Sequence, residues 1–209
     1  MSDMRDILKR ALPQADETAL NRFEIYQRLL AEWNERMNLT AITDPVEVAE
    51  KHFADSLAAL PYLKSGMRVI DVGTGAGFPG VPLLIMEPRL DLTLADSLQK
   101  RLTFLDALLK ELGLRAELVH GRAEDLGQNR LHRERYDAAL SRAVANLPVL
   151  LELTTPFVRV GGTAIAYKGD GAEELNSPLG KRCLVLAEKT EPTPKAYPRK
   201  AGTPNKKPL

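Results

Sequence analysis

A glycine-rich stretch at residues 69–80 constrains the fold more than any other part of this sequence. It reads Val-Ile-Asp-Val-Gly-Thr-Gly-Ala-Gly-Phe-Pro-Gly, with an apolar strand before the glycines and an apolar run at 81–85 after them. Clustered glycines let the backbone approach a ligand closely, and the N-terminus of the following helix presents unpaired N–H groups to that ligand. The stretch therefore predicts a strand, a ligand-binding loop and a helix.

Two kinds of ligand are compatible with this loop. The spacing Gly75-x-Gly77-x-x-Gly80 matches the fingerprint of dinucleotide-binding folds, in which the loop cradles a pyrophosphate. The spacing Gly73-x-Gly75-x-Gly77 after Asp71 instead matches the loop of class I S-adenosylmethionine enzymes. A carboxylate at the strand end repels a pyrophosphate but can hold an ammonium group, directly or through water. The loop therefore favours S-adenosylmethionine, which has an ammonium and no phosphate, with a nicotinamide dinucleotide as the alternative.

Length and composition limit the class of protein. The 209 residues suffice for one full domain with a sizeable core and an appendage. The only cysteine is Cys183 and the three histidines are scattered, so we expect no disulfide within the chain and no metal site. The N-terminus lacks an apolar segment, and no apolar run approaches the roughly 18 residues of a membrane span. We expect a cytoplasmic protein without a membrane partner, and a monomer by default.

Hydrophobic periodicity divides the chain into three parts. Residues 1–64 show helical spacing and predict an N-terminal helical cap, including a helix from Pro45 to Pro61. Residues 65–188 alternate between strand and helix patterns. The expected strands are 68–72, 91–95, 116–120, 136–141 and 163–168, and the expected helices are 80–86, 98–112, 123–126 and 146–158. This alternation predicts an α/β fold with a Rossmann-like, doubly wound and mostly parallel sheet.

Ligands in such sheets bind at the carboxyl ends of the strands, where polar residues follow two of the expected strands. Asp96, with Ser97 beside it, lies 23 residues after Gly73, close to the offset of about 20 residues expected for a carboxylate that binds ribose hydroxyls. Capping of the next helix is the alternative role of Asp96. The loop 121–125 can present a backbone N–H and an acceptor to an adenine edge, or it is simply a charged loop.

Two cations end later strands. Arg142 follows the fourth strand and is expected at the mouth of the pocket, where it would position substrate or donor. Its alternative role is a surface arginine paired with an acid. Lys168 ends the fifth strand and has a similar but weaker interpretation.

Methyl transfer from a sulfonium mainly requires alignment of the acceptor with the methyl carbon, so the residues present limit the acceptor. Attack by pyrimidine C5 generally needs a cysteine nucleophile, and nothing places Cys183 in the pocket. Attack by an exocyclic amine typically uses an Asn/Asp-Pro-Pro-aromatic loop, but this chain has Ser-Arg-Ala-Val at 141–144. The N7 atom of guanine already has a lone pair and needs no general base. N7 therefore fits this site, while carboxylate and hydroxyl acceptors stay open.

The C-terminal residues 189–209 form a basic, proline-rich arm with six basic residues and one acid. This composition predicts a polyanionic partner, with Tyr197, Arg199 and Lys200 as candidates for base stacking and phosphate contacts. The alternative is a solubilising tail.

Several segments together resemble one family over nearly the whole chain. They are Trp33-Asn34 with Asn38-Leu39-Thr40, His52-Phe53-Ala54-Asp55-Ser56-Leu57, Asp71 to Gly80, Asp96-Ser97-Leu98-Gln99-Lys100-Arg101, Ser141-Arg142-Ala143 and Tyr197-Pro198-Arg199-Lys200-Ala201-Gly202-Thr203-Pro204. The chain resembles the bacterial small-subunit (16S) ribosomal RNA guanine-N7 methyltransferases, also called the glucose-inhibited division protein B family.

The resemblance implies roles for individual residues. It implies that S-adenosylmethionine is contacted by Gly73, Phe78, Ala123, Glu124 and Arg142, with Asp96 near the ribose. It implies a guanine in the decoding region of 16S rRNA, in the small ribosomal subunit, as the acceptor. It also implies that Arg142, Lys168 and Arg199 lie near the RNA.

One departure from the family concerns the sheet edge. Members of the family usually have a helix and two strands between the Lys168 position and the basic arm, but only 13 residues, 169–181, precede the expected strand 182–188 here. Because a parallel crossover needs about a dozen residues or more, one strand is expected to be missing. This shortening favours one further alternative, a non-catalytic RNA-binding or assembly factor with a relic pocket. A nicotinamide-dependent oxidoreductase is the other.

Overall fold

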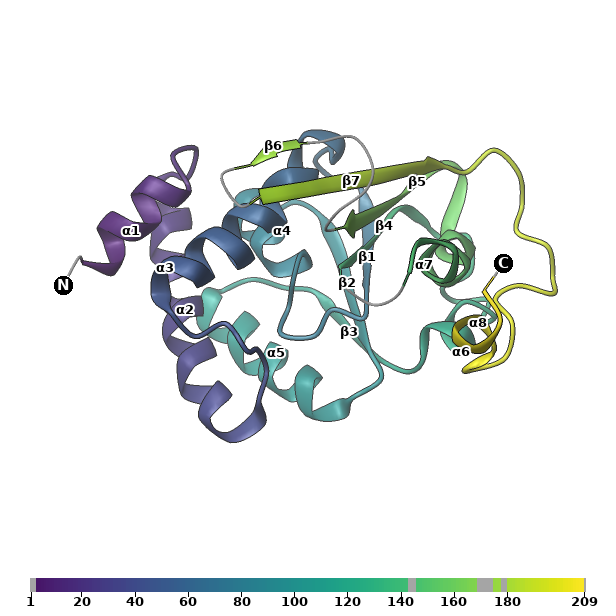
Figure 1. The fold of residues 1–209 in the computed structure, drawn as a ribbon, viewed down its shortest axis with the longest axis horizontal. Helices are drawn as coiled ribbons and strands as arrows, with labels where there is room; N and C mark the ends of the chain where they lie inside the picture. Colours follow the sequence, from purple (N-terminus) through teal and green to yellow (C-terminus); the bar gives the residue numbers. More distant parts are fainter. Residues whose placement is uncertain (1–2, 143–145, 169–174, 178–179, 209) are drawn as a thin grey trace.

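The computed structural model describes residues 3–142, 146–168, 175–177 and 180–208, and its centre is a seven-stranded sheet (Figure 1). The strands are β1 (Arg68–Val72), β2 (Asp91–Asp96), β3 (Glu117–His120), β4 (Tyr136–Arg142), β5 (Val158–Lys168), β6 (Leu175–Ser177) and β7 (Gly180–Glu188). Their order is β3-β2-β1-β4-β5-β7-β6. The first five are parallel, β7 is antiparallel to β5, and β6 is antiparallel to β7. The predicted α/β fold with a mostly parallel sheet is confirmed.

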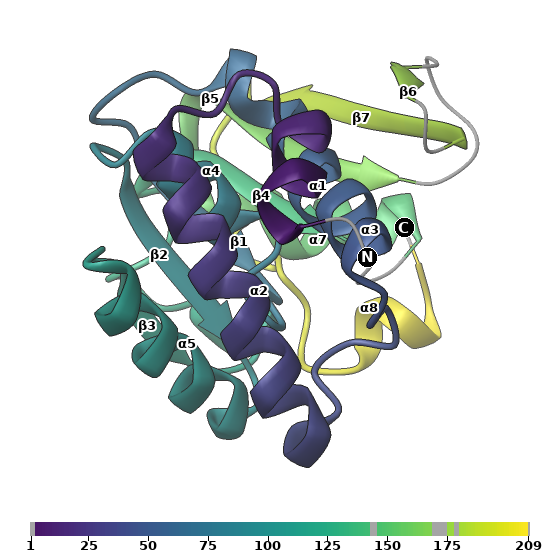
Figure 2. The same ribbon diagram turned by 90° about the vertical axis from the view of Figure 1, so that its left-hand side faces the viewer.

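Helices cover both faces of this sheet (Figures 1 and 2). The α-helices are α1 (Met4–Ala11), α2 (Glu17–Met37), α3 (Pro45–Glu47), α4 (Gly80–Met86), α5 (Gln99–Leu112), α6 (Ala123–Leu126), α7 (Leu147–Thr154) and α8 (Thr203–Lys206). A π-helix, η1 (Val48–Ala54), and two 3-10 helices, η2 (Leu57–Tyr62) and η3 (Thr155–Phe157), complete the set in the described residues. None of the described helices is long and apolar enough to cross a membrane.

Local sequence explains where several helices begin and end. The Asp16 carboxylate accepts the N–H of Ala19 at 2.7 Å and caps α2, and Gly113 adopts a left-handed φ of 61° at the end of α5. Asp44 caps α3 in the same way as Asp16 caps α2. The single helix expected from Pro45 to Pro61 is wrong, because this segment is divided into α3, the wider π-helix η1 and the tighter η2.

The N-terminal helices share one core with the sheet. Phe23 of α2 and Phe53 of η1 are fully buried, with ring centroids 4.9 Å apart. They belong to the same apolar cluster as Leu83 of α4, Phe104 of α5 and Ile165 of β5. Figure 2 shows α2 lying alongside α5. Residues 1–64, expected as a cap, therefore also form the outer layer on one face of the sheet.

Strand β5 begins five residues earlier than expected. The expected strand started after the glycine pair at 161–162, but this pair lies inside β5. A Cβ atom on Gly162 would lie 2.5 Å from the carbonyl oxygen of Asp137, so only glycine allows β4 and β5 to approach here. The strand that we expected to be missing is present as β6, but it has only three residues. The rest of the stretch 169–179 lies outside the described residues.

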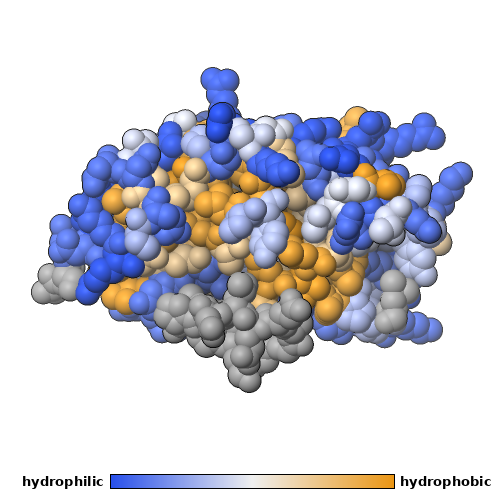
Figure 3. Space-filling view, turned by 90° about the horizontal axis from the view of Figure 1, so that it is seen from above, coloured by the Kyte–Doolittle hydropathy of each residue, from blue (hydrophilic) through white to orange (hydrophobic). Residues whose placement is uncertain are grey.

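Apolar side chains are exposed at the β7 side of the sheet. Figure 3 looks down on this side and shows an apolar area on the surface. Val160 of β5 and Leu186 of β7 are 46% and 41% exposed. Helix α7 packs against β5.

Candidate functional site

A cavity of about 520 Å³ lies at the carboxyl ends of β1, β2 and β4. This is where the strand order reverses, between β1 and β4, and it is where ligands of doubly wound folds bind. The volume falls within the range of roughly 300–1,000 Å³ typical of small-molecule sites. The walls come from the glycine loop, from the loops after β2 and β3, from the end of β4 and from the N-terminal segment 39–55.

Buried hydrogen bonds hold the glycine loop in shape. The Asp71 carboxylate accepts the Thr74 hydroxyl at 2.7 Å and the Gly80 N–H at 2.9 Å. From the other side, the Tyr26 hydroxyl of α2 donates to the Ala76 carbonyl at 2.5 Å. The loop is thus fixed both from the sheet and from the N-terminal helices.

The directions in which the glycines face distinguish the two ligands that the sequence left open. Gly73 and Gly75 line the cavity. Gly77 and Gly80 instead face the protein interior, where a Cβ atom would lie 2.7 Å from the Tyr26 hydroxyl and 2.7 Å from Leu94, respectively. In the dinucleotide fingerprint the second glycine lets the backbone approach the pyrophosphate, and here that glycine, Gly77, faces the protein interior.

Asp71 does not reach the cavity, contrary to the expected contact with an ammonium group. The side chain is completely buried behind the loop. Its Oδ1 atom has no hydrogen-bond partner among the described residues. Burial raises the pKa of Asp71 to about 6, against the lowering effect of the bonds from Thr74 and Gly80. Asp71 organises the loop.

Asp96 is in the cavity wall and connects the loops after β1 and β2. Its carboxylate is 2% exposed and accepts the Gly75 N–H at 2.9 Å and the Leu98 N–H at 2.8 Å. Arg101, which also lines the cavity, lies 3.2 Å away in an ion pair. Arg101 Nη1 donates to both carboxylate oxygens, at 3.2 and 3.5 Å, so the about four acceptor positions of Asp96 are occupied and hydroxyl donors of a ligand would replace these longer Arg101 bonds.

Glu124 connects the cavity to the C-terminal arm. Its Oε1 atom accepts the Gly202 N–H at 3.0 Å and forms an ion pair with Arg122 at 3.1 Å. Burial raises the pKa of Glu124, but these hydrogen bonds outweigh burial and the pKa is lowered. Asn205 of α8 also lines the cavity. The arm therefore forms part of the wall near Ala123 and Glu124.

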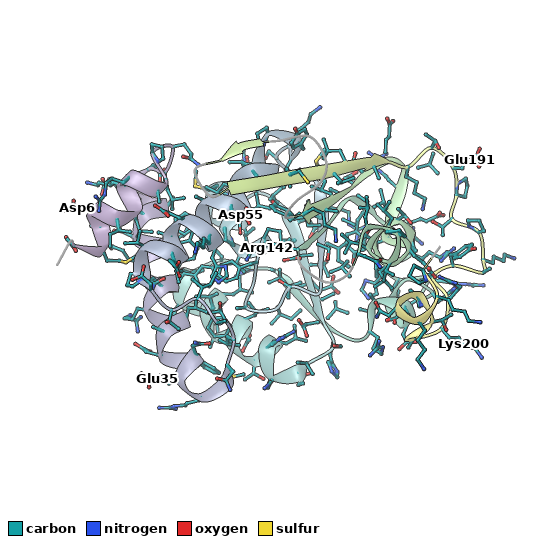
Figure 4. The ribbon with its side chains drawn as sticks, in the orientation of Figure 1. Asp6, Glu35, Asp55, Arg142, Glu191 and Lys200 are labelled. Atoms are coloured by element: carbon teal, nitrogen blue, oxygen red, sulfur yellow. The ribbon has the colours of Figure 1, made fainter. Side chains whose placement is uncertain are left out.

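The rest of the arm is docked on the body. Arg199 forms a two-pronged ion pair with Glu152 of α7, whose side chain is fully buried, and the Arg199 N–H donates to the same carboxylate. This pair lowers the pKa of Glu152. Arg199 was expected as a phosphate contact, and in the structure its guanidinium is bound to Glu152. Lys200 is exposed (Figure 4), and Lys168 does not line the cavity.

A second arginine, Arg133, binds the part of the arm that precedes Arg199 in the chain. Arg133 donates to the carbonyl oxygens of Thr193 and Tyr197, both at 2.7 Å. Lys189 forms an ion pair with Glu134 at 2.7 Å. These contacts fix the path of the arm along the body of the protein.

Arg142 lies between the sheet and the N-terminal segment. Its guanidinium carbon is 4.9 Å from the centre of the Phe78 ring, and Nη1 lies 3.2 Å from the Asp55 carboxylate. Figure 4 shows Asp55 and Arg142 next to each other at the centre of the molecule. The Arg142 side chain is 11% exposed, so it is a cavity residue and the expected surface alternative does not hold.

The structure brings most of the predicted site residues together. Those that line the cavity are Gly73, Gly75, Phe78, Asp96, Ser97, Ala123, Glu124 and Arg142. The cavity residues for which the sequence predicted no role are Leu39, Thr40, Ile42, Lys51, His52, Asp55, Arg101, Leu153 and Asn205. Val72, Thr74, Ala76 and Ala95 lie beside the predicted ones, and Gly121 and Arg122 belong to the loop expected at the adenine edge. Five of the residues without a predicted role lie in segments that carried the family resemblance, which was the available signal for them: Leu39, Thr40, His52, Asp55 and Arg101.

The polar groups that line the cavity suit a ligand with a ribose, an adenine and an amino acid. A buried carboxylate at Asp96, an acceptor at Glu124 and a bare loop at Gly73 and Gly75 lie along one cavity. No group of three or more His, Cys, Asp or Glu side chains among the described residues could hold a metal ion. The residues present therefore fit S-adenosylmethionine.

Known proteins match this chain in sequence along most of its length. The family GidB, described as rRNA small subunit methyltransferase G, matches residues 19–200. A relative named Ribosomal RNA small subunit methyltransferase G from Desulfitobacterium hafniense (strain Y51) is 47% identical over 214 residues, covering 91% of this chain and 89% of the relative. A relative of the same name from Halalkalibacterium halodurans is 44% identical over 235 residues, covering 100% of this chain and 99% of the relative.

Solved structures match the fold. A S-adenosylmethionine-dependent methyltransferase from Aquifex aeolicus gives a TM-score of 0.51 at 20% identity, covering 68% of this chain and 76% of that chain. A mutant of MtNAS in complex with S-adenosylmethionine gives a TM-score of 0.56 at 14% identity, covering 90% and 88%. These likenesses show the fold alone.

Proposed function

This chain belongs to the GidB family of rRNA small subunit methyltransferases, and we propose that it transfers a methyl group from S-adenosylmethionine to N7 of a guanine in 16S rRNA. The observation that carries this proposal is the cavity at the switch point of the sheet, where the glycine loop, Asp96, Glu124 and Arg142 meet. The family and the fold support S-adenosylmethionine as the cofactor and rRNA methylation as the activity.

Different residues of the chain would bind different parts of S-adenosylmethionine. Asp96 would accept the ribose hydroxyls while its bonds to Gly75 and Leu98 keep the carboxylate fixed. Ala123 and Glu124 would receive the adenine at the opposite wall. Bound there, S-adenosylmethionine supplies an electrophilic methyl group. Arg142 would fix the reacting end beside Phe78.

The acceptor end of the cavity supports a nucleophile that needs positioning alone. Guanine N7 carries its own lone pair, so no side chain has to remove a proton before attack. The polar groups at that end are Thr40, Lys51, His52 and Asp55, and the last two are bonded to Arg142. In-line approach of the base to the methyl group is the geometry that such a site can enforce.

The rRNA partner is supported by cationic side chains outside the cavity. Lys200 is exposed, and Lys206 and Lys207 follow it at the C-terminal end of the arm. Because Arg199 is bound to Glu152, these lysines are better candidates for phosphate contacts than Arg199. Replacing a lysine that binds a phosphate should weaken RNA binding and lower its dependence on salt concentration. Action as a monomer is part of the proposal.

Donor binding and methyl transfer can be tested with one set of variants. We expect S-adenosylhomocysteine to bind the protein, measured by calorimetry, and NAD not to bind. Asp96→Ala should lose at least about tenfold in this affinity because it removes the ribose acceptor. It should also lose transfer of a labelled methyl group to 16S rRNA. Binding of NAD without binding of S-adenosylhomocysteine would overturn the assignment of the cavity.

A further inference from the structure

Two N-terminal segments carry the family resemblance but have no role in donor binding as described so far. The first runs from Asn34 to Thr40, at the end of α2, and the second is His52 to Ser56, at the end of η1. They lie far apart in sequence from β4, yet the second contacts Arg142, the arginine at the carboxyl end of β4, and the first is joined to it through His52. Figure 4 labels the meeting point at Asp55 and Arg142.

The π-helix presents several acceptors to one guanidinium. Arg142 Nη1 lies 3.2 Å from the carboxylate of Asp55, 3.3 Å from the hydroxyl of Ser56, and 3.4 Å from each of the carbonyl oxygens of Lys51 and His52. A π-helix turn is wider than an α-helix turn and is common at functional sites. Here it ends with its carbonyls and the following carboxylate directed at the same cation.

His52 holds the other side of the guanidinium. Arg142 Nη2 lies 3.3 Å from His52 Nδ1, and since a guanidinium can only donate, Nδ1 is the acceptor and the ring proton is on Nε2. Nε2 donates to the Thr40 hydroxyl at 2.8 Å. Thr40 is held in turn by Asn34, whose amide bonds both the N–H and the carbonyl of Thr40 at 2.8 and 3.0 Å.

Phe78 provides the surface against which both groups rest. The imidazole of His52 is stacked on the Phe78 ring at 4.4 Å with an interplanar angle of 19°. The guanidinium of Arg142 lies over the same ring at 4.9 Å. Phe78 belongs to the glycine loop that lines the donor side of the cavity, so the network joins the donor side to the N-terminal segment.

We propose that Asp55 and His52 are positioning residues, which hold Arg142 in one orientation at the junction of the donor and acceptor halves of the site. The proposal rests on the proposed methyltransferase function and deepens it. An arginine side chain has many rotamers, and a guanidinium already fixed by a carboxylate, an imidazole and a ring loses little further freedom when ligands bind. Correct placement of such a group governs the alignment of the reacting atoms.

The test compares two replacements of Asp55 in the full chain. Asp55→Ala removes the carboxylate, and we expect the affinity for S-adenosylhomocysteine and kcat/KM for methyl transfer to fall by about 10- to 100-fold. Asp55→Asn keeps an oxygen acceptor for Arg142 Nη1, and we expect it to stay within about threefold of the wild type. Recovery by the conservative variant separates positioning from a need for the negative charge.

Matched controls separate positioning from folding. Glu50→Gln removes an exposed acid from the same π-helix and should change neither quantity. In an Arg142→Lys background, adding Asp55→Ala should lower the affinity and kcat/KM by less than about threefold further. The guanidinium that Asp55 positions is already absent from that background. Thermal unfolding of each variant shows whether it is folded. The proposal is overturned if folded Asp55→Ala keeps wild-type affinity and turnover, or if its effect multiplies fully with Arg142→Lys.

The affinity readout keeps the two proposals distinguishable. If the wild type binds S-adenosylhomocysteine but methylates no rRNA, the proposed function fails. The comparison of Asp55→Ala with Asp55→Asn in the binding experiment still decides the role of Asp55.

Discussion

Replacement of Asp71 by asparagine should change the way in which stability depends on pH. Burial raises the pKa of this carboxyl from an ordinary 3.8 to about 6 in the folded protein. Between these two values the folded state binds more protons than the unfolded state, so the contribution of Asp71 to stability is fully present below about pH 4 and is lost as the pH rises through 6. A gap of about two pKa units at about 1.4 kcal/mol each corresponds to roughly 3 kcal/mol.

Urea unfolding of the wild type and of Asp71→Asn at several pH values from 4 to 7 measures this contribution. Other groups titrate in both proteins, so the difference between the two free energies of unfolding isolates Asp71. We expect the wild type to lose about 3 kcal/mol relative to the variant across this range. Asp137→Asn is a control of opposite sign, since hydrogen bonds from Arg159 and Arg68 outweigh burial and lower the pKa of Asp137. Parallel pH curves for the wild type and Asp71→Asn would refute the reasoning.

Two further predictions concern the supports of the cavity. Tyr26→Phe leaves the buried Ala76 carbonyl without its donor, so we expect a loss of about 1–3 kcal/mol in the free energy of unfolding, while Tyr62→Phe at an exposed position should cost nothing measurable. Arg199→Ala leaves the buried Glu152 carboxylate without its ion pair, so we expect a loss of about 3 kcal/mol, with Glu152→Gln in the same chain recovering part of it. Stability of Arg199→Ala equal to the wild type would show that the arm is not docked through this pair.

Local signals in the sequence were sufficient for the parallel part of the sheet. Strand β1 at 68–72 and helix α4 at 80–86 occupy the expected residues, because glycines and apolar runs mark their ends. Strand β5 was predicted too short, because the Gly161-Gly162 pair has the composition of a break. The pair is instead required by the close approach of β4, which is a tertiary effect.

The site was predictable on its donor side and much less so on its acceptor side. Gly73, Asp96 and Glu124 follow strands, so the topology alone brings them together. Thr40 reaches the cavity because the Asn34 side chain at the end of α2 binds its backbone, and His52 reaches it from the π-helix η1. Neither arrangement has a recognisable local pattern in the sequence. Family resemblance marked these segments as specific, but only the packed structure shows that they meet Arg142.

The docking of the arm on the body could not be predicted from the sequence either. Composition correctly indicated a basic, proline-rich segment. The buried partners that fix it, Glu152 for Arg199 and Glu124 for Gly202, are acids on distant elements. Pairing of this kind depends on the fold as a whole and leaves no trace in the spacing of the arm itself.

Methyl transfer to small ribosomal subunits lacking their N7 mark decides whether this site performs the proposed reaction. A labelled methyl group on S-adenosylmethionine would be followed into the subunits, with naked rRNA alongside, and the modified base located by cleavage at N7-methylguanine. We predict label at one guanine of 16S rRNA, and none with Asp96→Ala. Absence of label from subunits and naked rRNA, in a protein that binds S-adenosylhomocysteine, would contradict the proposed function and favour a binding-only role.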